Sequence, residues 1–301
     1  MDRRGALAVT LLAAVLWGTS FPANDLGLRD ADPWTFLAAR FAIAFAAAAL
    51  AARLLGALDA GLLRNKWVWA TALANSAGYQ LQFVGQELTT PGTASLMVNA
   101  GNLAVPLFAF LVHGERPTGT KAPALALAAA GVLLVGTRGD LASVSAAHLA
   151  GTLLTLAAGL GWALVIVFNK SAVGSGKVLG VTTWVVGLTA LLGVPGALLL
   201  GHGELGPQGL AAAAYTGLVC TTLAFFLWSA GLRVLTSVVS GIALLLEIVV
   251  AFALSAALGL EALGAASLAG AACILAAIAL ASRAPAAEPL PTPKLGDGTR
   301  L

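Results

Sequence analysis

The chain has 301 residues, of which 59% are hydrophobic and only 10% are charged, and its mean hydropathy is +0.93. Soluble globular domains are about 25% charged, so this composition excludes a water-soluble enzyme or binding module. The formal net charge of +3 is small and implies no nucleic-acid partner.

Ten apolar segments follow one another along the chain, separated by short polar loops. A helix needs about 20 apolar residues to cross a bilayer whose hydrocarbon core is about 30 Å thick. Strand-like alternating segments are absent and 35 glycines lie among long Ala and Leu runs, which favours helices over a barrel. The sequence therefore predicts an all-α integral membrane protein with ten transmembrane helices. The predicted spans are residues 6–24, 34–55, 67–85, 92–112, 120–137, 149–168, 178–200, 210–232, 237–258 and 264–280.

The distribution of Lys and Arg predicts the orientation of these spans. With the N-terminus in the cytoplasm, the inner segments hold all but three of the 16 Lys and Arg residues. The exceptions are Arg29 and Arg138 in outer loops and Arg40 within the second span. Because cytoplasmic loops are enriched in Lys and Arg, we expect both termini in the cytoplasm. A missed helix would reverse every later loop and destroy this bias.

The first span and the C-terminal segment each have a distinct sequence character. Bulky Trp17 and Phe21 stand near the end of the first span, where a signal peptide would need small residues, so this span is expected to be retained. Residues 284–301 are rich in Pro and polar residues and are expected to form a disordered cytoplasmic tail. Cys220 and Cys273 fall within spans and are predicted to be buried apolar residues rather than a disulfide.

A weak internal duplication divides the chain into residues 1–140 and 141–283. Trp17 and Asn24 correspond to Trp162 and Asn169 at an offset of 145, and Glu115 corresponds to Glu261 at an offset of 146. Each half has five predicted spans, an odd number, so the second half must enter the membrane in the opposite sense. Two inverted five-helix repeats are typical of secondary transporters, with the substrate site near the midplane.

Several short motifs lie where each half opens and closes. They are Trp17-Gly18, Arg40-Phe41, Gly114-Glu115-Arg116, Gly161-Trp162-Ala163, Glu247 and residues 223–233. These motifs resemble the drug/metabolite transporter superfamily, in its EamA-like branch of ten-span permeases, over about residues 6 to 282. The resemblance implies a bacterial inner-membrane exporter of small metabolites such as amino acids or amphipathic compounds, without naming the cargo. Two departures are Ile248, where the family commonly has Pro, and Leu260, where it usually has Gly.

Polar side chains spaced by three or four residues mark helix faces that avoid lipid. The third span carries Asn75, Tyr79, Gln82 and Gln86 in one stripe, and the fourth carries Ser95, Asn99 and Asn102. These stripes predict either a polar pathway or hydrogen bonds between helices. Trp17 and Trp162 lie well inside their spans, where each is expected to form an aromatic wall of a pocket or to pack against small residues. We expect Trp17, Tyr79, Gln82, Asn99, Asn102 and Trp162 to bind substrate.

Two charged residues lie within the predicted spans. Glu247 is ten residues from one end of the ninth span and eleven from the other, and a charge there costs about 2.5 to 3.5 kcal/mol. This carboxyl suits a proton site or a receiver for a substrate amine, and its alternative role is a structural hydrogen bond. Arg40 lies about 10 Å deep. It is a candidate for binding a substrate carboxylate, and otherwise pairs with an acid such as Glu87 or reaches the surface.

Glu115 and Glu261 are expected to be structural, each at the positive N-terminus of the last span of its half. The three histidines lack ligand spacing, so no metal site or cofactor is expected. No HExxH motif or Ser/His/Asp set supports a membrane-embedded enzyme, and a scaffold protein would have no use for buried polar stripes. A secondary transporter is therefore favoured. Its expected partners are a small-molecule substrate, the lipid bilayer and protons as a candidate coupling ion, and a homodimer is left open.

Overall fold

The computed structural model describes residues 1–89, 91–115, 121–137, 146–260 and 264–283. Within these ranges the regular structure is helical, apart from an isolated bridge between Ala31 and Leu205. The helices are α1 Arg3–Gly27, α2 Pro33–Leu54, η1 Ala60–Arg64, α3 Lys66–Glu87, α4 Pro91–Ala100, η2 Gly101–Ala104, α5 Val105–His113, α6 Lys121–Thr137, α7 Ala146–Val173, α8 Val178–Leu200, α9 Pro207–Tyr215, η3 Thr216–Leu223, α10 Ala224–Leu232, α11 Ser237–Leu244, α12 Leu246–Ala257 and α13 Ala265–Ala281. The expected tail, residues 284–301, lies outside the described residues.

Helices suited to a membrane dominate the described part of the chain. Seven helical stretches there are long and apolar enough to cross a bilayer, and two more apolar helices, Lys121–Leu134 and Ala265–Ala281, are shorter. Helix α3 has 22 residues but is not among the seven, because its polar stripe lowers its hydropathy. The prediction of an all-α membrane protein is confirmed. The number of ten spans stays a prediction.

Short polar side chains and glycines set where the helices begin and end. Asp32 caps α2 by accepting the Thr35 N–H, and Thr236 caps α11 by accepting the Val239 N–H. Gly114 follows the last residue of α5, and Gly259 lies two residues after the end of α12, with φ of 68° and 71°. Only glycine adopts this left-handed conformation without steric cost. The two glycines are 145 residues apart, the offset of the internal duplication.

Two of the spans predicted as single helices are interrupted near their middle. In the fourth, α4 gives way to the 3₁₀ turn η2 before α5 begins. In the ninth, α11 ends at Leu244 and α12 begins at Leu246, with Leu245 and Ile248 making turn-like hydrogen bonds to carbonyls three residues earlier. The eighth predicted span contains a third irregularity, the π-helical segment η3 between α9 and α10. Hydropathy marks apolar length and does not detect such interruptions.

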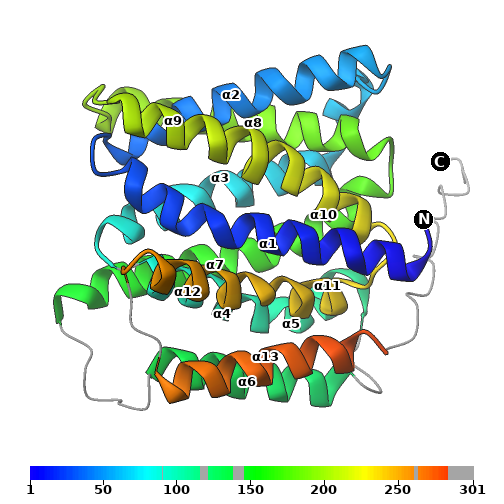
Figure 1. The fold of residues 1–301 in the computed structure, drawn as a ribbon. Helices are drawn as coiled ribbons and strands as arrows, with labels where there is room; N and C mark the ends of the chain where they lie inside the picture. The colour runs from blue at the N-terminus through cyan, green and yellow to red at the C-terminus, as the bar shows by residue number, and fades with distance from the viewer. Residues whose placement is uncertain (90, 116–120, 138–145, 261–263, 284–301) are drawn as a thin grey trace, which may run out of the picture.

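The two halves of the chain pack into each other. Helix α1 of the first half packs on α10 and α12 of the second, and α7 of the second packs on α3 and α4 of the first. Helix α2 packs on α8, and α6 and α13 form a pair at the edge of the bundle (Figure 1). Gly101 and Gly159 allow α7 to approach η2 and α4 closely, since a Cβ on Gly101 would overlap the backbone of Gly159 and a Cβ on Gly159 would overlap the carbonyl of Val98. Each hydrophobic cluster of the described residues contains side chains from both halves.

Candidate functional site

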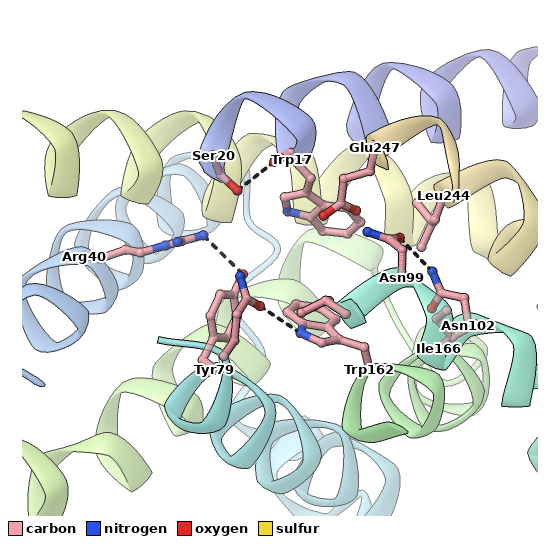
Figure 2. Close-up of a pocket in the computed structure, with 12 residues that line it drawn as sticks. Trp17, Ser20, Arg40, Tyr79, Asn99, Asn102, Trp162, Ile166, Leu244 and Glu247 are labelled. Carbon is pink, nitrogen blue, oxygen red and sulfur yellow. Dashed lines mark hydrogen bonds between the residues drawn. The ribbon is translucent and has the colours of Figure 1, made fainter. Parts of the chain in front are cut away.

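A cavity inside the bundle brings together side chains from both halves of the chain. Its walls come from α1, α2, α3, α4 with η2, α7, α11 and α12 (Figure 2). The cavity has an empty volume of about 410 Å³, of which about 30 Å³ is open to the centres of water-sized molecules. That room holds about two waters. The lining side chains are Trp17, Ser20, Arg40, Tyr79, Gln82, Val98, Asn99, Asn102, Trp162, Ile166, Leu244 and Glu247.

All eight residues selected from the sequence lie on the wall of this cavity. Their role in binding or proton uptake stays a prediction. The sequence did not point to the other four lining residues. Ser20 and Ile166 had a usable signal, because they lie three and four residues after Trp17 and Trp162 and so share a helix face with them. Val98 and Leu244 are apolar and carried none.

Two tryptophans from equivalent positions of the halves meet at the centre of the site. The rings of Trp17 and Trp162 lie 5.9 Å apart between centroids, inclined at 60°. The Trp17 indole N–H donates to the carbonyl of Cys220, within η3, at 2.5 Å. The Trp162 indole N–H donates to Oε1 of Gln82 at 3.2 Å. Both rings therefore have fixed orientations, and neither serves only to fill space between small residues.

The interruptions of the fourth and ninth spans deliver the polar groups to the cavity. Asn99 lies near the end of α4 and Asn102 lies within η2, and the Asn102 amide donates to Oδ1 of Asn99 at 3.0 Å. Glu247 lies in the first turn of α12, directly after the other interruption. Non-helical backbone at membrane depth is tolerated where it is buried in protein or lines a cavity. Both interruptions meet this condition.

Glu247 faces Asn99 across the cavity (Figure 2). The Glu247 side chain is buried, with 8% of its surface exposed. Within the described ranges, no Lys, Arg or His nitrogen lies within 4.0 Å of its carboxyl group. Since an ionised carboxylate in such surroundings is costly, this group must be protonated, solvated by water in the cavity, or matched by a positively charged ligand.

Arg40 is 99% buried, so it does not reach the surface. Its guanidinium donates to Oγ1 of Thr221 at 2.8 Å, to Oδ1 of Asn24 at 3.3 Å and to the hydroxyl of Tyr79 at 3.2 Å. It is not paired with Glu87 or with any other described carboxylate. The alternatives of snorkelling and of an ion pair within the protein are therefore wrong for the described residues. Thr221, which is 181 residues from Arg40, had no signal in the sequence.

The polar stripe of α3 has two functions rather than one. Tyr79 and Gln82 line the cavity. Asn75 instead donates to Thr189 of α8 at 2.9 Å, and Gln86 donates to the carbonyl of Phe21 in α1 at 2.8 Å. The outer members of the stripe are thus contacts between helices, and the inner members face the cavity.

Glu115 caps a different helix from the one expected. Its two carboxylate oxygens accept the N–H groups of Ser237 and Val238, each at 3.1 Å, at the start of α11. The expectation that it sits at the N-terminus of the last span of its own half is therefore wrong. A carboxylate at a positive helix end was correctly expected, but the chain folds so that the nearest free helix end belongs to the other half. Its counterpart Glu261 lies outside the described residues.

The thiols and histidines give no second chemical site. Cys220 is buried as expected, whereas Cys273 is half-buried, and both are free. His113 forms a hydrogen bond with Ser171 at 2.7 Å. In the part of the chain that the structure describes, no group of three His, Cys, Asp or Glu residues could hold a metal ion.

Several known proteins are similar to this chain. An uncharacterized transporter of Archaeoglobus fulgidus is 29% identical over 234 residues, covering 74% of this chain and 77% of the relative. An uncharacterised Pseudomonas aeruginosa protein is 32% identical, covering 85% and 86%. A probable amino-acid metabolite efflux pump of Escherichia coli K12 is 31% identical over 175 residues, covering 56% of this chain and 54% of that pump.

The fold also has a counterpart among solved structures. A crystal structure, described only as that of a protein, superposes with a TM-score of 0.78 over 94% of this chain and 99% of its own, at 19% identity. At this identity the likeness shows the fold alone. The model of the EamA-like transporter family matches the chain twice, over residues 4–137 and 149–283. These two matches together cover most of the chain, and the chain belongs to the EamA-like transporter family.

Proposed function

We propose that this protein is a secondary transporter that exports small metabolites, such as amino acids or amphipathic organic compounds, by alternating access. Family membership makes it a multi-pass membrane transporter of a small-molecule substrate and not an enzyme. The observation that carries the rest is the cavity, where polar and aromatic side chains of both halves meet at two interrupted helices. Secondary transporters place their substrate at such interruptions.

An inverted repeat is part of the proposal. If residues 1–140 and 141–283 are equivalent, each contact between halves should recur with the halves exchanged. The packing of α1 on α10 recurs as α7 on α3, and the packing of α1 on α11 and α12 recurs as α7 on α4 and on η2 with α5. The helix interruptions and the left-handed Gly114 and Gly259 also occur in both halves. This recurrence supports two inverted five-helix units. The distribution of Lys and Arg supports both termini in the cytoplasm, and we propose a bacterial inner-membrane protein.

The cavity must widen for any organic solute to enter. Its space for about two waters is far below the roughly 300 to 1,000 Å³ of pockets that hold small molecules. The interruptions next to Asn102 and Glu247 lack part of the regular helical ladder and are the natural places for bending. We infer that the halves move around these points while the solute stays in contact with Trp17 and Trp162.

Glu247 is proposed as the ionisable centre, which takes up a proton or a substrate amine. The purified protein in liposomes loaded with individual amino acids or amphipathic amines should release at least one of them, faster when a proton gradient is imposed. Glu247→Gln keeps the size and the contact with Asn99 but cannot ionise, so we expect a folded protein with lost transport or lost pH dependence. Glu204→Gln, an exposed acid in the α8–α9 loop, is the matched control and should transport normally.

Two results would contradict the proposal at different levels. Wild-type rates and an unchanged pH profile for Glu247→Gln would remove this residue from the mechanism and leave transport intact. A reporter fused after Arg283 that signals the outside would remove the topology and with it the inverted repeat.

A further inference from the structure

Arg40 is a buried cation that has no partner of opposite charge among the described residues. Its guanidinium is on the wall of the cavity, and the three groups that accept its hydrogen bonds, on Thr221, Asn24 and Tyr79, are all neutral. Its central carbon also lies 4.8 Å from the ring centroid of Tyr79 and 5.6 Å from that of Phe83. Hydroxyls, an amide and aromatic faces solvate a cation in part, but none of them cancels its charge.

These contacts hold the guanidinium in one orientation before any ligand arrives. Asn24 is itself within 3.5 Å of Oε1 of Gln86, and Gln86 donates to the carbonyl of Phe21. Of the five N–H donors of an arginine, three are used, so two remain for a ligand. The Tyr79 hydroxyl accepts from Arg40 and also forms a side-chain hydrogen bond with Thr221. The cavity wall thus offers a fixed cation with two N–H donors left for a ligand.

We infer that the transported solute carries a carboxylate, which binds Arg40. A guanidinium matches the planar geometry of a carboxylate and can bind it through two parallel hydrogen bonds. The remainder of the solute lies against Trp17 and Trp162, whose ring faces suit an apolar side chain. This inference rests on the proposed function of the cavity and adds the chemical class of the cargo. Neutral and purely cationic solutes are excluded as preferred substrates.

Matched pairs of acids and amides test the inference. The probes are L-phenylalanine with L-phenylalaninamide, L-leucine with L-leucinamide, and 3-phenylpropionate with its amide. Binding raises the unfolding temperature by mass action. At least one acid should stabilise the wild type at a concentration about tenfold or more below that of its amide. Arg40→Gln should lose this preference, and Arg40→Lys, which keeps the charge but not the fork, should retain part of it.

Asn24→Asp gives a second test that does not depend on removing Arg40. The substitution puts a carboxylate oxygen where the amide oxygen now lies 3.3 Å from Arg40. We expect the new acid to pair with Arg40, to raise the unfolding temperature and to abolish binding of the acids. Asn169→Asp is the matched control at the equivalent position of the other half. There the amide donates to Ser229, its buried oxygen has no partner, and an acid should destabilise the protein.

The outcomes separate this inference from the proposed function. Equal binding of acids and amides, acid binding that survives Arg40→Gln, or unchanged acid binding by Asn24→Asp would overturn the carboxylate assignment while solute binding stands. Transport of neutral or cationic solutes alone would do the same. If no probe or other small metabolite binds or crosses the membrane, the proposed transport function itself fails, and the assignment fails with it.

Discussion

The two ends of the helix bundle are held together by similar groups in different surroundings. At one end, proposed to be cytoplasmic, Glu115 and Lys170 bind the main chain where α10 turns into α11. At the other, Asp32 of the α1–α2 loop accepts the main-chain N–H groups of His202 and Glu204 in the α8–α9 loop, and Asp30 accepts those of Gln208 and Gly209 in the first turn of α9.

The difference lies in the water beside each end. Both ends include a carboxylate at a helix N-terminus, and the side chains of Lys170 and Asp32 are both buried. The end with Asp30 and Asp32, however, lies beside an open cavity of about 810 Å³, which Asp32 and Glu87 line. Hydrogen bonds gain more where water does not compete for the same groups. The contacts of Lys170 and Glu115 should therefore contribute more to stability than those of Asp30 and Asp32, at the end beside the open cavity (the wet end).

Lys170→Met should have the largest effect. The Lys170 ammonium donates to the carbonyls of Leu232 at 2.7 Å and Leu235 at 2.6 Å, and methionine fills a similar volume without any donor. Hydrogen bonds to a charged group contribute about 1.5 to 3 kcal/mol, so we expect the free energy of unfolding to fall by about 3 kcal/mol. Denaturant unfolding of the solubilised protein measures this change.

Lys177→Met is the matched control for that measurement. The Lys177 ammonium also donates to a carbonyl, that of Gly56 at 2.6 Å, but this contact is exposed. Exposed substitutions usually change stability by less than about 0.5 kcal/mol. Equal losses in the two variants would contradict the idea that burial ranks these contacts.

Glu115→Gln should have the next largest effect. Each carboxylate oxygen of Glu115 accepts one N–H, and glutamine replaces one of these oxygens with an NH₂ donor, so the bond to Ser237 or to Val238 is lost together with the favourable charge at the start of α11. We expect a loss of about 1 to 2 kcal/mol. Hydrogen exchange of the first turn of α11 should become faster while exchange in α3 stays unchanged. Unchanged exchange in α11 would mean that Glu115 does not hold the two halves together.

The sequence predicted the helices and the lining of the cavity from local spacing. Tyr79, Gln82 and Asn99 were selected from stripes along single helices, which depend only on the 3.6-residue period, and Glu247 was selected from its place in the middle of a span. Contacts set by the packing of distant helices were not predictable in this way. Glu115 was assigned to the nearest helix in the chain, whereas it binds one 122 residues away.

The sequence also did not predict where the helical backbone is irregular. The interruptions after Ala100 and at Leu245, and the π-helical η3, lie in stretches as apolar as their neighbours. Hydropathy measures side chains, while an interruption depends on whether nearby groups satisfy the freed carbonyls, as Trp17 does for Cys220. That information exists only in the packed structure.

The pH dependence of the free energy of unfolding tests the contribution of Asp32 at the wet end. Burial acts to raise the pKa of Asp32, but hydrogen bonds from Thr35 and from the main chain of His202 and Glu204 outweigh it and hold the pKa below its usual 3.8. A lowered pKa in the folded state gives stability that is present above about pH 4 and is lost as the pH falls through the folded value. Asp32→Asn should cost about 1 kcal/mol at pH 7. That difference should shrink below pH 4, and a difference that stays constant down to pH 2 would contradict this account.

The smallest effect is expected for the ion pair between Arg29 and Asp25, at the same end as Asp32. The two side chains are one helical turn apart at 3.0 Å, and 55% and 26% of their surfaces are exposed. Exposed pairs at this spacing contribute about 0.3 to 0.5 kcal/mol and are screened by salt. Arg29→Gln should therefore lower the free energy of unfolding by no more than this amount, and about 1 M NaCl should remove the difference. A loss as large as that of Glu115→Gln, or one that salt does not reduce, would show that the wet end is held as firmly as the end closed by Lys170.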